Sequence, residues 1–170
     1  MAQRYPGMHG NRRVVSLLLI RQGFACFYCG MRIEIGADRP ERLATLDHKI
    51  ALAFGGEPFG DNTVAACRMC NRTKGSLDAA TFLAVRNDHP RRRRLEREAQ
   101  RRIAEQTKEE RRLIRARIKE THCASRQRLW DTLGPILQSY KAALAQQAEA
   151  GDLKSPQSRF KSEEPHQICQ

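Results

Sequence analysis

The sequence lacks the long apolar run that a membrane-spanning helix requires. One short apolar stretch, residues 14–20, is interrupted by Ser16 and followed by Arg-Gln-Gly rather than by the small residues of a signal-peptide cleavage site. It is also far shorter than the roughly 20 residues needed to cross a bilayer. We therefore expect neither a membrane segment nor a secretory signal.

Acidic residues are scarce relative to basic ones. The 170 residues include 31 Lys and Arg but 19 Asp and Glu, which gives a formal net charge of +12 and a pI near 10. Nucleic acid is the commonest polyanionic partner of a small basic protein. A solvated basic surface without such a partner remains the alternative. The length allows one modest domain with extensions.

The spacing of the cysteines argues against a disulfide scaffold. Of the six cysteines, four form two CxxC pairs that begin 41 residues apart, namely Cys26, Cys29, Cys67 and Cys70. Two such pairs can surround one tetrahedral Zn²⁺. A redox dithiol is the alternative for either pair alone. Metal-bound thiolates favour a reducing, cytoplasmic location, and we expect Cys123 and Cys169 to be plain thiols.

Local patterns between and around the cysteines predict a hairpin followed by a helix. A first helix is expected from Asn11 to Gly23, after a loose arm at residues 1–10. Residues 43–48 have strand character, and the turn residues that follow lead to a second strand beginning at Asn62. A helix then opens at Cys67 and carries the second cysteine pair.

After residue 75 the sequence predicts further helices. Ser76 is expected to cap a short one, and a long basic helix is expected from Pro90 to about residue 133. Gly134-Pro135 should kink or end that helix, and a shorter helix should follow over residues 136–150. We expect His122 to be a solvated helix residue and residues 151–170 to be disordered.

Four polar residues within the cysteine frame suit phosphodiester hydrolysis, which needs a general base and a cation on the phosphate. His48 is the candidate base, because a neutral imidazole accepts a proton near pH 7. Asp47 and Asn71 offer oxygen ligands to Mg²⁺. Asn62 can orient His48 through its amide or through the local backbone. Hydrogen-bond, turn and cap duties are the alternatives for all four.

These residues together resemble the HNH endonuclease family in its zinc-binding subtype. The resemblance rests on Cys26-x-x-Cys29, Leu46-Asp47-His48, Gly55-Gly56, Asp61-Asn62 and Cys67-x-x-Cys70-Asn71-x-x-Lys74, and it covers roughly residues 11–88. It implies that His48 is the general base, Asn62 orients it, Asp47 and Asn71 bind the catalytic metal, and the four cysteines bind structural zinc. Two departures are the absence of Pro shortly after His48 and the use of Asn71 where many members have His.

The expected fold class is α+β, a small ββα-metal HNH core with structural zinc followed by a long basic helical extension. The expected domains are a flexible arm at 1–10, the nuclease at 11–88, the helical extension at 89–150 and a disordered tail at 151–170. The expected activity is metal-dependent cleavage of DNA with Mg²⁺ or Mn²⁺ as catalytic ion. We expect a cytoplasmic protein without a membrane partner, encoded by a bacterium or a phage.

Basic residues near the site and in the extension are candidates for phosphate contacts. Residues 91–120 hold thirteen Lys and Arg against six Asp and Glu, a net charge of +7. The candidates are Arg72, Lys74, Arg91, Arg92, Arg93 and Arg94. Two alternatives to a nuclease remain: a non-catalytic zinc-dependent nucleic-acid-binding module, and a helical assembly protein that self-associates or binds a protein partner through residues 90–150.

Overall fold

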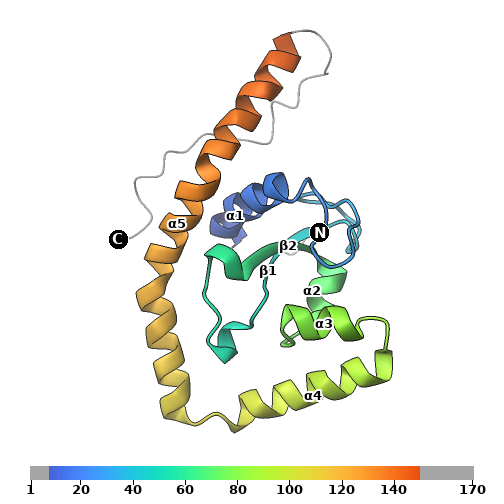
Figure 1. Cartoon of the computed structure of the whole chain (residues 1–170), viewed down its shortest axis with the longest axis vertical. Coiled ribbons are helices and arrows are strands. Elements are labelled where there is room, and N and C mark those ends of the chain that lie inside the picture. Colours follow the sequence, from blue (N-terminus) through green and yellow to red (C-terminus); the bar gives the residue numbers. More distant parts are fainter. Residues whose placement is uncertain (1–7, 150–170) are drawn as a thin grey trace.

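The structure is a computed structural model that describes residues 8–149. This part of the chain forms α1 (Met8–Arg21), β1 (Ala44–His48), η1 (Leu52–Phe54), η2 (Gly60–Asn62), β2 (Thr63–Cys67), α2 (Arg68–Lys74), α3 (Ala79–Val85), α4 (His89–Glu105) and α5 (Lys108–Glu149). The predicted α+β class is confirmed. The two-stranded sheet and α2 lie in the middle, with α4 and α5 forming an angled frame around them (Figure 1).

The two strands form the predicted hairpin. They are antiparallel, with Asp47 opposite Val64 and His48 opposite Thr63. Successive side chains of a strand point to opposite faces, so Asp47 and His48 project in different directions at the end of β1. Cys67 closes β2 and caps α2, since its sulfur accepts a hydrogen bond from the Cys70 N–H at 3.2 Å. The hairpin and α2 therefore bring the candidate catalytic residues and the second cysteine pair onto one small unit.

The core continues from the sheet into the C-terminal helix. α1 packs on both strands and on α5. Leu17 and Leu18 of α1 are 1% exposed, and Leu129 and Leu133 of α5 are 3% and 1% exposed in the same cluster. The basic extension is thus part of the packed structure as well as a carrier of charge.

The extension contains a break that the sequence analysis did not anticipate. α4 ends at Glu105, and Thr107 caps α5 in a capping box: its hydroxyl accepts from the Glu110 N–H, and the Glu110 carboxylate accepts from the Thr107 N–H. The Gln106 side chain donates to Ala53 O at 2.7 Å. This break lets the chain change direction between α4 and α5 (Figure 1).

Of the kink or end expected at Gly134-Pro135, the end is wrong, because α5 runs through Pro135 to Glu149. Proline removes one backbone hydrogen bond from a helix interior, at a cost of about 3 kcal/mol. Leu133 is buried just before Pro135, and Leu137 packs on the core just after it. Tyr140, one turn later, lies 5.9 Å from the Phe24 ring. We infer that contacts on both sides of the proline hold the helix together.

Three smaller expectations also need correction. α1 begins at Met8 rather than Asn11, so the last residues of the expected arm are helical. Asp78, not Ser76, caps α3, and its carboxylate accepts from the Thr81 N–H at 2.9 Å. Residues 1–7 and the expected tail at 151–170 lie outside the described part of the chain. Within residues 8–149 no helix is both long and apolar enough to cross a membrane.

Candidate active site and metal centre

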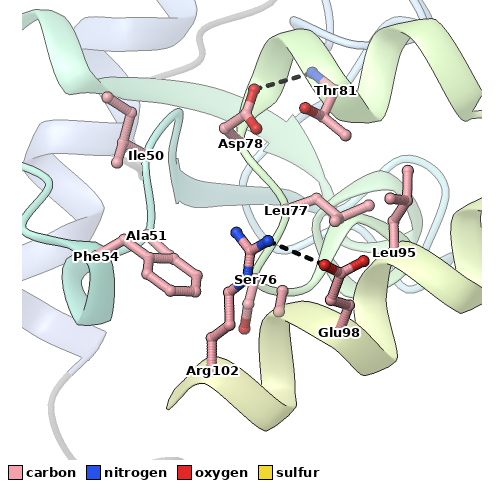
Figure 2. Close-up of a pocket in the computed structure, with 11 residues that line it drawn as sticks. Ile50, Ala51, Phe54, Ser76, Leu77, Asp78, Thr81, Leu95, Glu98 and Arg102 are labelled. Carbon is pink, nitrogen blue, oxygen red and sulfur yellow. Dashed lines mark hydrogen bonds and ion pairs between the residues drawn. The ribbon is translucent and has the colours of Figure 1, made fainter. Parts of the chain in front are cut away.

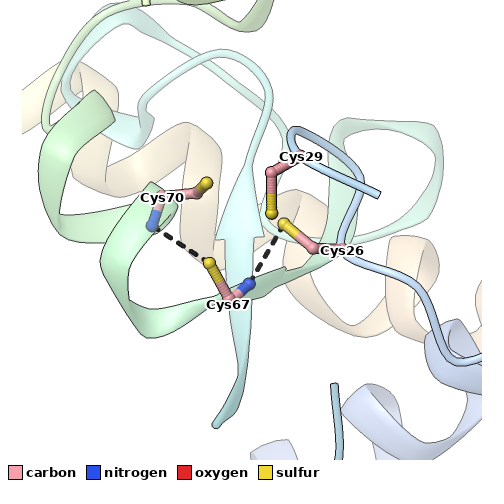
Figure 3. A group of neighbouring side chains, drawn as sticks. All are labelled: Cys26, Cys29, Cys67 and Cys70. Atoms are coloured by element: carbon pink, nitrogen blue, oxygen red, sulfur yellow. Dashed lines mark hydrogen bonds between the residues drawn. The ribbon is translucent and has the colours of Figure 1, made fainter. Parts of the chain in front are cut away.

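The two cysteine pairs meet in space (Figure 3). Among the described residues, Cys26, Cys29, Cys67 and Cys70 place their four sulfur atoms within 4.8 Å of one another. Zn–S bonds of about 2.3 Å in a tetrahedron put the sulfurs roughly 3.8 Å apart. The cluster therefore fits a structural zinc ion after little or no adjustment.

Backbone N–H groups support this cluster. The Cys67 N–H donates to the Cys26 sulfur at 3.3 Å, and Gly30, at φ 71°, provides the tight turn after the first pair. Burial alone would raise the pKa of Cys26, but hydrogen bonds from backbone N–H groups outweigh it and lower that pKa. Burial raises the pKa of Cys67 and Cys70, and nearby thiolates add to the effect. Four thiolates at this separation need a cation, which is the chemistry of a zinc site.

Asp47 lies in a second buried cluster. The residue is 6% exposed; one carboxylate oxygen accepts from the Tyr28 hydroxyl at 2.5 Å, and the other lies 3.4 Å from the Lys74 ammonium. Burial and the Asp47 carboxylate raise the pKa of Tyr28, so the hydroxyl stays protonated and donates. We call this group of Asp47, Tyr28 and Lys74 the carboxylate cluster. It links β1 to α2 and to the first cysteine turn, residues 26–30.

The prediction that Lys74 contacts phosphate is therefore wrong. The sequence suggested a phosphate contact, but the residue is 1% exposed and its ammonium also donates to Gly75 O at 3.3 Å. Its charge neutralises Asp47 inside the protein. Among the other candidates, Arg72, Arg91, Arg93 and Arg94 are exposed. Arg92 is half-buried and donates to Arg86 O at 2.7 Å.

Asn71 lies on α2 and is turned toward β1. Its amide nitrogen donates to Thr45 Oγ1 at 3.1 Å and to Leu46 O at 3.0 Å. These bonds fix the direction of the amide group. No hydrogen bond to its amide oxygen is found within residues 8–149, so that oxygen is the atom with free ligand capacity.

His48 is half-buried at the end of β1. Its Nε2 lies 3.1 Å from Pro58 O. A carbonyl oxygen can only accept, so this contact places the proton of the neutral ring on Nε2 and leaves Nδ1 unprotonated. Burial lowers the pKa of the imidazole, while the Pro58 carbonyl and Asp47 oppose this shift. The lowered pKa keeps the ring neutral at pH 7, as a general base requires.

Asn62 acts on the backbone around His48 rather than on the ring itself. Its amide accepts from the Ile50 N–H at 2.8 Å and donates to Ile50 O at 3.0 Å and Glu57 O at 2.7 Å. Gly56 has no room for a side chain, because an added Cβ would lie 2.1 Å from Ile50 O. Asn62 thus closes the loop that carries Pro58, the partner of His48.

Several residues important to this arrangement were missed by the sequence analysis. Tyr28 lies between the paired cysteines, where its hydroxyl gives no local signal of its partner. The contact of Pro58 with His48 is made by a backbone oxygen, which the residue type does not indicate. The Thr107-x-x-Glu110 capping box, in contrast, has a recognisable sequence signature that predicts the break before α5.

A cavity of about 330 Å³ lies between the hairpin and α4 (Figure 2). Ile50, Phe54, Leu77 and Leu95 supply apolar walls, and the ion pair between Arg102 and Glu98, at 2.9 Å, lies beside it. None of the predicted catalytic or metal-binding residues lines this cavity. The candidate active site at the end of β1 and this cavity are therefore separate features of the structure.

Comparison with protein families gives a match to the family model described as HNH endonuclease, over residues 26–77. Searches among curated proteins and among solved structures found no match to the chain. The matched range includes both cysteine pairs, β1, β2 and α2. Residues 26–77 are therefore a domain of the HNH endonuclease family, with a four-cysteine cluster that can bind zinc.

Proposed function

We propose that this protein is a metal-dependent endonuclease that hydrolyses phosphodiester bonds in DNA. The observation that carries the proposal is the setting of His48: its half-buried ring is held through Nε2 by the Pro58 carbonyl at 3.1 Å, and burial lowers the pKa of the imidazole. A module that only binds nucleic acid needs no such base. The HNH family match supports a nuclease role in general.

In the proposed reaction His48 takes a proton from the attacking water at Nδ1. The carbonyl of Pro58 holds the ring in the required tautomer and stabilises the imidazolium that forms, because Nε2–H remains its donor. Asn62 preserves the distance between these groups by closing the loop. His48 thus accepts the proton, and the backbone fixes its direction.

The catalytic ion that the family implies would be held by Asp47 and Asn71, as Mg²⁺ or Mn²⁺. A carboxylate and an amide oxygen are ligands of the kind that hard cations prefer. Asn71 Oδ1 has free capacity, and the Asp47 carboxylate offers about four lone-pair positions, of which Tyr28 and Lys74 use two. The donor set therefore fits. When bound, such an ion would neutralise charge on the phosphate and stabilise the leaving oxygen.

The basic extension supplies sequence-independent phosphate contacts in this proposal. Arg91, Arg93 and Arg94 are exposed and stay candidates, as does the exposed Arg72 on α2, outside the extension. A further basic cluster at the start of α5, formed by Lys108, Arg111, Arg112 and Arg115, lines a surface hollow of about 260 Å³. Such contacts position DNA and weaken steeply with salt.

A second candidate is a non-catalytic, zinc-dependent DNA-binding module. The observation that favours it is the burial of Asp47 among its own partners, which is also what a purely structural carboxylate would show. The two candidates differ in whether His48 matters for anything besides folding.

Cleavage of supercoiled plasmid with Mg²⁺ tests the proposal, comparing wild type with His48→Ala. Removal of a general base should slow cleavage by about two to four powers of ten, while zinc content, melting temperature and DNA affinity stay unchanged. Wild-type cleavage should also stop when Mg²⁺ is omitted and EDTA is added briefly. Equal cleavage rates for wild type and His48→Ala would reject this site as the nuclease centre.

A further inference from the structure

The segment that joins β1 to β2, residues 49–62, is the hairpin loop. It is closed at its base, because the Lys49 N–H donates to Asn62 O at 2.7 Å. It carries Pro58, whose carbonyl oxygen lies 3.1 Å from His48 Nε2. The position of this one peptide group therefore decides where the His48 ring is held.

The residue after Pro58 is held by the C-terminal helix. Phe59 is buried, and its ring meets the His122 ring edge-on, with centroids 5.1 Å apart and planes at 71°. The guanidinium carbon of Arg126, one turn along α5, lies 6.0 Å from the Phe59 centroid. The expectation that His122 is a solvated residue is therefore wrong. His122 and Arg126, both on α5, pack against the Phe59 ring.

Two further contacts hold the hairpin loop from the extension. Arg128 of α5 lies 3.7 Å from the Glu57 carboxylate. Gln106, between α4 and α5, donates to Ala53 O at 2.7 Å. The extension therefore contacts the loop on both sides of Gly55-Gly56.

We propose that α5 positions the general base: His122 and Arg126 hold Phe59, and Phe59 sets the direction of the Pro58 carbonyl that fixes His48. The Pro58 carbonyl and the Phe59 N–H belong to the same planar peptide unit. A shift of the Phe59 backbone therefore moves this carbonyl with it. His122, Arg126 and Phe59 are positioning residues, since they act on His48 through this peptide.

The catalytic consequence rests on the proposed function of His48, while the conformational consequence does not. Full-length His122→Ala/Arg126→Met tests both. The ¹H–¹³C NMR signal of His48 Cε1, assigned with His48→Gln, should shift or broaden. Amide exchange in residues 50–62 should become about two- to tenfold faster, the range expected from loss of an edge-on aromatic contact. The kcat for plasmid cleavage should fall about tenfold with little change in KM, because a misplaced base slows the chemical step.

Two further variants separate positioning from general damage to the fold. His122→Phe/Arg126→Lys keeps an aromatic edge and a cation and should restore the wild-type NMR signal and kcat. Cys123→Ala/Gln127→Ala changes exposed neighbours on the same helix and should behave as wild type. The rate of amide exchange at residues 26–30 and 67–70, which carry the two cysteine pairs, should be unchanged in all three double variants.

The inference is wrong if the His48 signal in His122→Ala/Arg126→Met matches that in Cys123→Ala/Gln127→Ala. It is also wrong if the signal changes while kcat does not. If the wild-type protein cleaves no DNA, the proposed function fails, and the NMR comparison still decides whether α5 positions His48.

Discussion

The cysteine cluster and the carboxylate cluster connect the same parts of the protein but differ in how their negative charges are balanced. Each ties the first cysteine turn to the unit of β1, β2 and α2. The cysteine cluster gathers up to four negative charges and needs an added cation to balance them. The carboxylate cluster contains its own cation, the ammonium of Lys74. The first link should therefore depend on metal supply, while the second depends only on the sequence.

The largest effect should come from removing zinc. Structural zinc contributes an apparent 10–16 kcal/mol in zinc-finger peptides, so a strong chelator or Cys67→Ser should unfold the region of residues 26–77. Elemental analysis should give one zinc per folded wild-type chain, and circular dichroism should follow its loss. A chelated, zinc-free protein with an unchanged melting temperature would contradict this prediction.

Lys74→Met should be the next most damaging change, although it keeps most of the side-chain volume. It leaves the buried Asp47 carboxylate without its cation, which should cost about 3–5 kcal/mol. Urea unfolding in excess zinc measures this. Asp47→Asn/Lys74→Met removes both charges and should recover much of the loss. If the double variant is less stable than Lys74→Met, the two charges do not form a pair.

Tyr28→Phe should have a smaller effect on the same cluster. It removes one hydrogen bond to a charged oxygen and leaves the ring packed edge-on against Phe82, with centroids 5.2 Å apart. Such bonds contribute about 1.5–3 kcal/mol. Urea unfolding and zinc analysis should show lower stability with unchanged metal content. Loss of zinc in Tyr28→Phe would mean that the two clusters are not independent links.

Arg115→Ala should have the smallest effect on stability, although it removes the same charge as Lys74→Met. Arg115 is exposed, and exposed substitutions usually change the free energy of unfolding by less than about 0.5 kcal/mol. If Arg115 contacts a phosphate, the plot of log binding constant for DNA against log salt concentration should have a slope shallower by about 0.9 in the variant. A truncation at residue 89 cannot replace this test, since it would remove the buried Leu129 and Leu133. An unchanged slope would remove Arg115 from the DNA interface.

The features predictable from the sequence are those whose signals are local. Cys67 and Cys70 lie one helical turn apart, and the alternation of residues 43–48 places Asp47 and His48 on opposite faces. Lys74, in contrast, is buried because it pairs with Asp47, which lies 27 positions earlier in the chain, so no local pattern signals this contact. Its residue type suggests a surface charge, so only the packing of α2 on β1 shows otherwise.

The roles of the extension were harder to predict for a similar reason. Its charge dominates the sequence of residues 91–120 and suggests a solvated arm. The contact of His122 with Phe59 joins residues 63 positions apart. Leu129 and Leu133 form only a thin apolar stripe, and its partner, α1, is at the other end of the chain.

The packing of α1 on α5 has a consequence for synthesis on the ribosome. α1 and the whole HNH domain are made before Leu129 and Leu133 of α5, the helix that packs on α1. At rates of roughly 5–20 residues per second, this interval lasts several seconds. During it, the apolar side of α1 is available to chaperones or to other nascent chains. A stalled chain ending before residue 129 should therefore crosslink to such partners, whereas one that exposes residues up to 149 outside the ribosome should not.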